Sequence, residues 1–163
     1  MDYKNQPAFK LRRWIINELI DSELIYINDY NGIDPVVPVQ DIDELSEKLG
    51  SLPYMFYFSI PMPNPNKNNI HMKQEMLYIS ILANNYTEIS AMSSFLVDLL
   101  DRADLSAADA NQSVTDGSVS FQMITLEDSE EVLKTEQPAG RYVQQLCFSY
   151  KYVRPILGNG RSA

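Results

Sequence analysis

Residues 72–103 are the stretch that most constrains what this chain can fold into. They begin with MKQEMLYISILA, an apolar strand with polar residues at its start. After Asn84 and Asn85 the spacing changes to three and four, which places six apolar side chains on one helical stripe: Ile89, Met92, Leu96, Leu99, Leu100 and Ala103. A strand that turns so quickly into an amphipathic helix folds back, and the helix lays its stripe on the sheet. The stretch therefore predicts the core of a small α+β domain.

The start of this helix carries the residue types that usually begin one. Asn85 or Thr87 can accept a hydrogen bond from a free backbone N–H of the first turn. Glu88 follows in that turn, where the helix dipole favours a negative charge. We therefore expect one of the two polar residues to act as the N-cap.

Three further segments complete a predicted sheet of about four strands. They are residues 52–60, 119–126 and 141–153. In the last segment one face is rich in aromatic residues and should be the core face: Tyr142, Leu146, Phe148, Tyr150 and Tyr152. The opposite face carries Val143, Gln145, Cys147 and Ser149. Residues 52–60 are apolar on both faces, so we expect both to be covered, by a second layer or by another subunit.

Helices are predicted before the first strand. Residues 8–21 follow Pro7 and have apolar side chains spaced four residues apart, which predicts a helix with one apolar face. The neighbouring Arg12 and Arg13 indicate either a solvated face or a contact with an acidic partner. A shorter helix is predicted over residues 41–49, ended by Gly50, which tolerates the left-handed backbone that often closes a helix.

The remaining segments are interpreted as connections. In residues 25–27 two isoleucines alternate with a tyrosine, which predicts a short strand. Residues 34–38 contain two prolines, which predict an extended crossing segment instead of a central strand. Residues 104–118 lack a period and predict an exposed, mobile, acidic loop, and residues 156–163 predict a loose tail. The expected fold is α+β, a single domain over residues 1–163 with an ordered core over 8–155. Its sheet should be mixed, mainly antiparallel, and packed against two main helices.

The charge of the chain is strongly uneven. The net charge is −9 over 163 residues, and residues 103–140 hold eight acids against one lysine, which accounts for −7. An acidic surface repels phosphate, which argues against binding of a nucleic-acid backbone through a basic patch. We expect the acidic connections to lie at the rims of the sheet.

Residues that support catalysis or metal binding are scarce. The chain holds one cysteine and one histidine, so a disulfide framework and a zinc cluster within one chain are excluded. Cys147 is interpreted as a buried thiol and His71 as an exposed loop residue. Glycine-rich phosphate loops and a calcium-loop spacing are missing from the sequence. We therefore predict no enzyme activity, no cofactor and no metal. The first residues do not form a signal-peptide pattern and no run is long enough to span a membrane, so a cytosolic product is expected.

The order of elements and some local sequences resemble the tail terminator, or tail-completion, proteins of tailed bacteriophages. The matching features are a proline-introduced strand at residues 52–57, the strand-to-helix unit at 77–100, and an acidic turn through Gly140-Arg141-Tyr142 into a final strand that ends FSYKY. The resemblance is one of layout and covers residues 8–155. The long segment at 24–51 and the segment at 104–118 depart from the family pattern and leave the tail type open, contractile or non-contractile.

This resemblance implies a structural virion protein that assembles in the host cytoplasm. Such proteins form a homo-oligomeric ring, usually a hexamer, at the head-proximal end of the tail. The ring ends growth of the tail tube and joins the tail to the head-side connector, or stopper, protein. The implied partners are other copies of the chain, the tail-tube protein, the connector, and genomic DNA that passes through the lumen without specific binding. No membrane is implied.

Two alternatives stay open at this point. One is a head-completion or connector protein of the phage neck, and the other is a cytosolic tail-assembly module that binds or chaperones a tail protein. The suspected interface residues lie in the proline-rich tip at 61–69, in the charged connector at 127–137 and just after it: Pro61, Met62, Asn64, Lys67, Glu127, Asp128, Glu130, Glu131, Lys134, Glu136 and Arg141.

Overall fold

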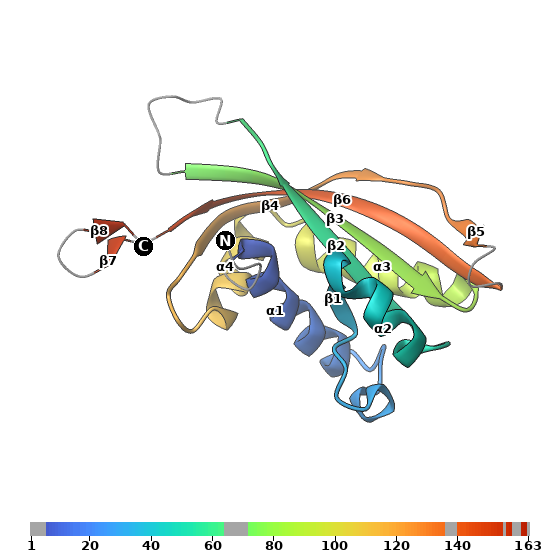
Figure 1. Cartoon of the computed structure of the whole chain (residues 1–163). Coiled ribbons are helices and arrows are strands. Elements are labelled where there is room, and N and C mark those ends of the chain that lie inside the picture. Colours follow the sequence, from blue (N-terminus) through green and yellow to red (C-terminus); the bar gives the residue numbers. More distant parts are fainter. Residues whose placement is uncertain (1–5, 64–71, 136–139, 155, 158–160, 163) are drawn as a thin grey trace.

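The structure is a computed structural model that describes residues 6–63, 72–135, 140–154, 156–157 and 161–162. It contains one mixed sheet with helices packed against one side (Figure 1). The helices are α1 (Pro7–Asp21), α2 (Ile42–Leu49), α3 (Tyr86–Leu100) and α4 (Asp104–Ser113), with short 3-10 turns at Ile27–Tyr30 and Val39–Asp41. The strands of the sheet are β1 (Val36–Pro38), β2 (Tyr54–Pro61), β3 (Met72–Ala83), β4 (Ser120–Ser129), β5 (Leu133–Thr135) and β6 (Arg141–Val153). A two-residue pair, β7 (Ile156–Leu157) and β8 (Arg161–Ser162), follows.

The two longest strands form the centre of the sheet. The strand order is β1-β2-β3-β6-β4, and β5 pairs with β6 on the same side as β4. All neighbours are antiparallel except β1 and β2, which are parallel. β3 and β6 pair without a break from Met72↔Val153 to Ala83↔Tyr142. The predicted α+β class and mainly antiparallel sheet are therefore confirmed.

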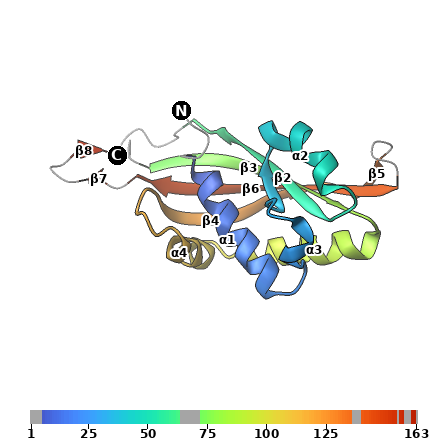
Figure 2. The ribbon, with the colours of Figure 1, turned by 60° about the horizontal axis from the view of Figure 1, so that its bottom comes forward.

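One face of the sheet is covered by α1, α3 and α4, while α2 lies beside the β1 edge (Figures 1 and 2). The strand residues on this covered face are almost inaccessible, among them Leu77, Ile79, Ile81, Leu146, Phe148 and Tyr150. The predicted aromatic core face of β6 is thus confirmed. Such burial of large apolar side chains supplies most of the free energy that favours folding of a domain this size.

The strand-to-helix unit folds as its sequence predicts as far as Leu100, but Ala103, predicted on the helical stripe, lies beyond α3 with a positive φ of 53° and forms a bridge to Ile124. Asn85 is the N-cap of α3, and its Oδ1 atom accepts a hydrogen bond from the Glu88 N–H at 2.8 Å. The Glu88 carboxylate accepts in return from the Asn84 N–H at 2.9 Å. This reciprocal capping fixes the start of α3, and its buried stripe includes Ile89 and Leu96.

The loop predicted over residues 104–118 is wrong, because its first ten residues form α4. The buried side of this helix consists of small residues, Ser106, Ala107 and Ala110, which give almost no apolar periodicity. Alanine is the strongest helix former, so the alanines of this segment were the sequence signal for a helix, although the polar residues around them suggested a loop. Ser106 also donates to the Leu99 carbonyl at 2.7 Å and so joins α4 to the end of α3.

Smaller differences concern the strands. The predicted strand at 25–27 is wrong, since residues from Ile27 form a 3-10 turn, and the extended segment at 34–38 contains the edge strand β1. The sheet has six strands instead of about four, because β1 and β5 add three residues each. Four α-helices occur in the described chain: the two predicted main helices, the predicted shorter one over residues 41–49, and α4, which was not predicted. Two described residue pairs beyond position 155 form β7 and β8, where a loose tail was predicted. None of the helices among the described residues is long and apolar enough to cross a membrane.

Candidate functional site

The side of the sheet opposite the helices carries no second layer within the described residues (Figure 1). We call this surface the open face. Strand registers place eight side chains of its middle on this side: Phe56, Phe58, Ile60, Met76, Tyr78, Thr125, Cys147 and Ser149. The prediction that both faces of β2 would be covered is therefore not met by this chain alone.

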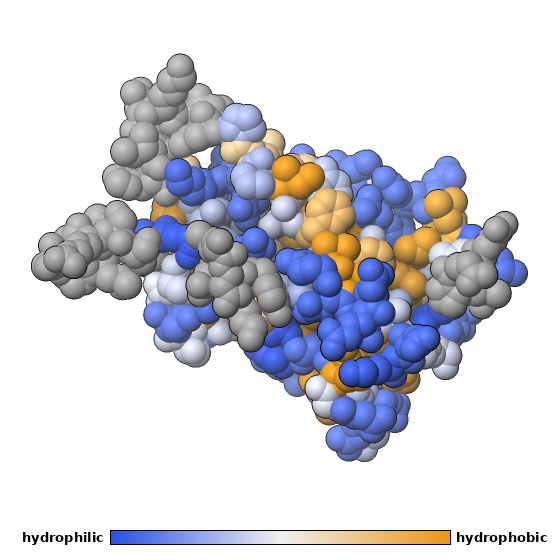
Figure 3. Space-filling model, in the orientation of Figure 1, coloured by the Kyte–Doolittle hydropathy of each residue, from blue (hydrophilic) through white to orange (hydrophobic). Residues whose placement is uncertain are grey.

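The half of the open face on β2 and β3 is apolar. Phe58 and Tyr78 stack with their ring centroids 4.9 Å apart and their planes 13° apart. Ile60 beside them is 47% exposed, which is a large fraction for an aliphatic strand residue. In Figure 3 hydrophobic patches are interspersed with hydrophilic surface in the region where β2 crosses the middle of the sheet in Figure 1. A half-exposed cluster of this kind is typical of a surface that another molecule covers.

The half of the open face on β6 and β4 is polar. The Glu127 carboxylate accepts hydrogen bonds from Ser149 at 2.5 Å and from Thr125 at 3.3 Å. Cys147 is 7% exposed, as predicted for a buried thiol, and burial raises its pKa, although a hydrogen bond with Tyr78 opposes this shift. The proximity of Cys147 raises the pKa of Tyr78 in turn. These contacts hold the side chains in place and leave no activated nucleophile, because the thiol is neutral near pH 7.

One end of the open face is closed by Arg141. Its guanidinium donates to the carbonyls of Gly50 and Leu52, each at 2.6 Å, and its central carbon lies 5.3 Å from the Tyr54 ring centroid. Arg141 is only 4% exposed, and burial lowers its pKa from the usual arginine value. Within the chain this predicted interface residue joins β6 to the segment between α2 and β2.

The charged connector is mostly strand. β4 continues to Ser129, so Glu127 and Asp128 belong to it, and Lys134 lies in β5. Glu130 and Glu131 are exposed in the bend between these strands. The backbone N–H of Glu130 donates to the Gln145 carbonyl at 2.9 Å, which holds the bend against β6. Glu130 and Glu131 therefore lie at the rim of the sheet, as predicted, whereas Glu127 belongs to β4 and its carboxylate lies on the open face, because β4 continues into the predicted connector.

The proline-rich tip is described only in part. Pro61 and Met62 are exposed at the end of β2, and the Met62 N–H donates to the Gln74 carbonyl at 2.9 Å. Asn64, Lys67, His71 and Glu136 lie outside the described residues. Among the described residues, no three histidine, cysteine, aspartate or glutamate side chains are grouped so that they could hold a metal ion.

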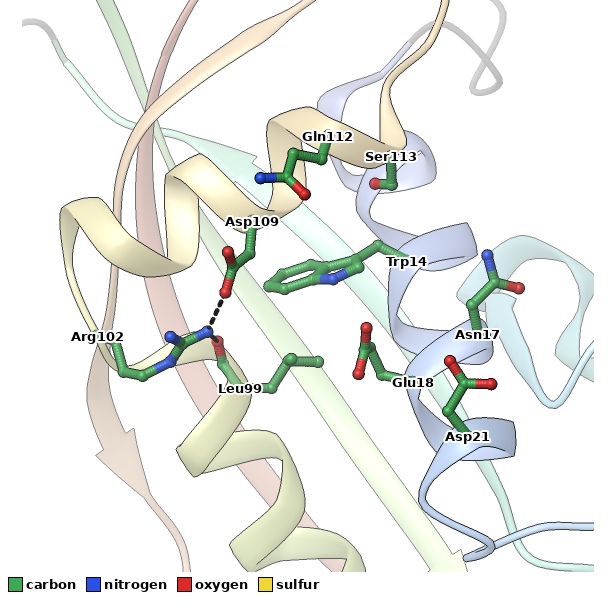
Figure 4. Close-up of a pocket in the computed structure, with 9 residues that line it drawn as sticks. All are labelled: Trp14, Asn17, Glu18, Asp21, Leu99, Arg102, Asp109, Gln112 and Ser113. Carbon is green, nitrogen blue, oxygen red and sulfur yellow. Dashed lines mark hydrogen bonds and ion pairs between the residues drawn. The ribbon is translucent and has the colours of Figure 1, made fainter.

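A groove on the helical side was not predicted from the sequence. It lies between α1, the end of α3, and α4, and has a volume of about 540 Å³ (Figure 4). Its lining is rich in polar and charged side chains: Trp14, Asn17, Glu18, Asp21, Leu99, Arg102, Asp109, Gln112 and Ser113. The sequence signal that could have indicated it is a pair of acids in the last turn of α1, where a base is usual.

The paired arginines of α1 lie on another part of that helix. Arg12 is 8% exposed, forms an ion pair with Asp34 and covers the Phe9 ring at 4.1 Å. Arg13 is exposed and lies 3.5 Å from the same carboxylate. Of the two predicted alternatives, the contact with an acidic neighbour is the correct one. It joins α1 to the segment before β1.

No protein family model matches the chain, and no curated protein matches it either.

Proposed function

We propose that this chain is a structural subunit of a phage virion that assembles into a closed ring at the head-proximal end of the tail. In that position it ends growth of the tail tube and joins the tail to the head-side connector. The proposal rests on the resemblance of layout described above and on one structural observation, the open face. A half-apolar sheet surface without a second layer is what a subunit would cover with its neighbour.

The outer edge of β4 is already occupied by hydrogen bonds within the chain, which favours assembly through the faces of the sheet over addition of a strand at this edge. On the outer edge of β4, Asn111 accepts from the Phe121 N–H at 2.7 Å and donates to the Phe121 carbonyl at 2.8 Å. Ala103 exchanges two backbone hydrogen bonds with Ile124, at 3.0 and 3.2 Å, and Asp101 accepts from the Leu126 N–H. An edge occupied in this way cannot add the strand of another chain. Assembly through this side would therefore use side chains.

Repeated contacts of one face with a different surface of the next subunit are heterologous. Such contacts close into a ring when the rotation between subunits permits, and a closed ring stops growing. This property suits a terminator. It also separates the proposal from symmetric pairing of two open faces, which would give a dimer and leave no surface for a third copy.

The acidic rim suits a channel for DNA. Glu130 and Glu131 are exposed, and like charge would keep the phosphate backbone from adhering as it passes. Neutralising both together with Glu136 should slow DNA passage and reduce infectivity. Unchanged infectivity of that triple variant would remove the channel from the proposal and leave the ring itself in place.

A second candidate, a monomeric tail-assembly module, uses the same observation, since an exposed aromatic face can also bind a client protein. The two candidates differ in their mass in solution. Light scattering behind a sizing column, with negative-stain images of the same peak, should give a population near a hexamer with a central hole. A ring that closes only on the tube should appear after mixing with tail-tube protein. A chain that stays monomeric under both conditions contradicts the ring.

A charged substitution on the open face tests which surface assembles. Phe58→Glu should abolish the ring, because it places a carboxylate where an apolar contact is expected. Leu105→Glu is the matched control, since Leu105 is 59% exposed on α4 and faces away from the sheet. It should leave the ring intact. Equal urea midpoints of the two free variants would establish that assembly, not folding, has changed.

A further inference from the structure

The groove of Figure 4 is negatively charged and only partly neutralised. Three carboxylates line it, from Glu18, Asp21 and Asp109, against the single guanidinium of Arg102, so its net charge is −2. Arg102 is already engaged, because it pairs with Asp109 at 2.8 Å. The carboxylates of Glu18 and Asp21 form no ion pair within the described residues.

Two helices end at this groove, and they end differently. At the end of α3, Arg102 donates to the carbonyls of Asp98 and Leu99, at 3.0 and 3.5 Å, so a cation meets the negative end of the helix dipole. The last turn of α1 contains Glu18 and Asp21 and no base. Carboxylates there add to the negative end of the dipole. The chain thus places a cation at one helix end and leaves the other without one.

Trp14 provides an independent observation in the same place. Its side chain projects from α1 into the groove and lies beside Glu18 (Figure 4). The residue is only 4% exposed, and its indole N–H, which has no hydrogen-bond partner among the described residues, is not one of the fully buried polar atoms and so opens on the groove. An indole N–H in such a position usually finds an acceptor, and a ligand in the groove could provide one.

We propose that this groove binds a basic peptide segment of a partner protein. An arginine or lysine side chain of that segment lies against Trp14 and pairs with Glu18 and Asp21. A peptide carbonyl beside it accepts the Trp14 N–H. The bound cation then lies at the negative end of the α1 dipole, as Arg102 does at the end of α3. This binding site is on the helical side and does not depend on ring formation through the open face.

A peptide cation fits the lining better than a metal ion. The described acids do not gather into a group that could hold a metal, whereas a guanidinium is wide, planar and able to bridge separated carboxylates. The length of the groove across three helices also suits an extended segment. Asn17 and Gln112 at its exposed border can pair with further peptide groups.

Trp14 is the only tryptophan of the chain, so its fluorescence reports on the groove without a label. The probe is the synthetic peptide acetyl-Gly-Arg-Gly-Arg-Gly-amide, titrated to millimolar concentration into the full chain. The control peptide carries citrulline at both arginine positions, which keeps the shape and removes the charge. We expect a saturable change with the arginine peptide that weakens as salt is added, and at most a small linear change with citrulline.

A double variant assigns the response to the carboxylates. Glu18→Gln with Asp21→Asn should lower the affinity of the chain for the arginine peptide at least about tenfold, which corresponds to about 1.4 kcal/mol of binding free energy. The matched control, Asp43→Asn with Glu44→Gln on exposed positions of α2, changes the net charge equally and should bind as the natural chain does. Isothermal titration calorimetry of the same pairs detects any binding that leaves the fluorescence unchanged. Equal binding of the citrulline peptide, equal loss in both double variants, or no binding by either method would overturn the proposal.

Discussion

The two faces of the sheet are built by the same strands and have opposite surroundings. On β6, Phe148 faces the helices and is 0% exposed, whereas its neighbours Cys147 and Ser149 face away from them. On β3, Ile79 is buried under the helical layer and Tyr78 lies half-buried on the open face. The strands thus bury one face under helices of the same chain, whereas on the other face Cys147 and Ser149 are buried and Ile60 stays 47% exposed.

This difference would separate folding of the chain from its proposed assembly. The covered face has the fully buried aliphatic and aromatic side chains that stabilise a single domain. The open face combines a half-exposed aromatic cluster with a polar network around Glu127. Substitutions on the two faces should therefore affect different measurements, stability for the first and assembly for the second.

The largest expected difference comes from one residue pair. Phe148→Ala should lower the free energy of unfolding by about 3–5 kcal/mol, because it leaves a cavity under the helices. Phe58→Ala removes a stacked but half-exposed ring and should cost about 1 kcal/mol in the free chain. Urea denaturation of the two variants measures both values.

The assembled state should reverse this order. Phe58→Ala should reduce ring formation at protein concentrations where the natural chain assembles, although it folds almost normally. If both substitutions cost the same in the free chain, the open face is covered after all, and the distinction between the faces fails. The two measurements on one pair of variants therefore test the comparison directly.

Arg141 tests how far the open face extends, because it closes one end of that face. Arg141→Met keeps much of the side-chain length but leaves the carbonyls of Gly50 and Leu52 without their donor, and should cost about 2–3 kcal/mol. Arg141→Lys keeps the charge and can reach one carbonyl, so its loss should be smaller. Urea denaturation gives both values, and Arg13→Met serves as control for loss of an exposed arginine. Equal losses for Arg141→Met and Arg13→Met would contradict a structural role of Arg141.

Much of this architecture could be predicted from local patterns. β3, β6 and α3 carry strong periods and a capping sequence. The bounds of both strands and the start of α3 agree with the prediction, whereas α3 ends at Leu100, before the predicted Ala103. α4 was missed because alanine and serine pack it without an apolar stripe. For β2, both faces are apolar, so its pattern could not show which side receives the helices. That choice is made by α1 and α3, which are distant in sequence.

The surfaces were harder to predict than the elements. The acidic rim was expected because its charges are consecutive in the chain. The groove was not, since its lining comes from three helices and contains no motif. Asp109 and Arg102 meet there only because α4 turns back across the end of α3. Because residues 104–118 were predicted to be a loop, the helix that forms one wall of the groove was not expected, and neither was the groove.

The smallest effect concerns tyrosines on the two faces at alkaline pH. Burial raises the pKa of Tyr150 well above the ordinary value of 10.0, and its hydroxyl donates to Glu75 in the core. Because the folded pKa is the higher one, the stabilisation is complete below pH 10 and is lost as the pH rises through the folded value. Tyr150→Phe should flatten this alkaline decline and lower stability at neutral pH by about 1–2 kcal/mol, because Glu75 loses its donor.

Tyr78→Phe, on the open face, should change the neutral value less, because that hydroxyl is near solvent. Urea midpoints measured from neutral to alkaline pH compare the variants. An unchanged alkaline slope in Tyr150→Phe would mean that this buried phenol does not limit the fold, and the pH sensitivity would then belong to other tyrosines whose pKa burial raises, such as Tyr30 and Tyr152.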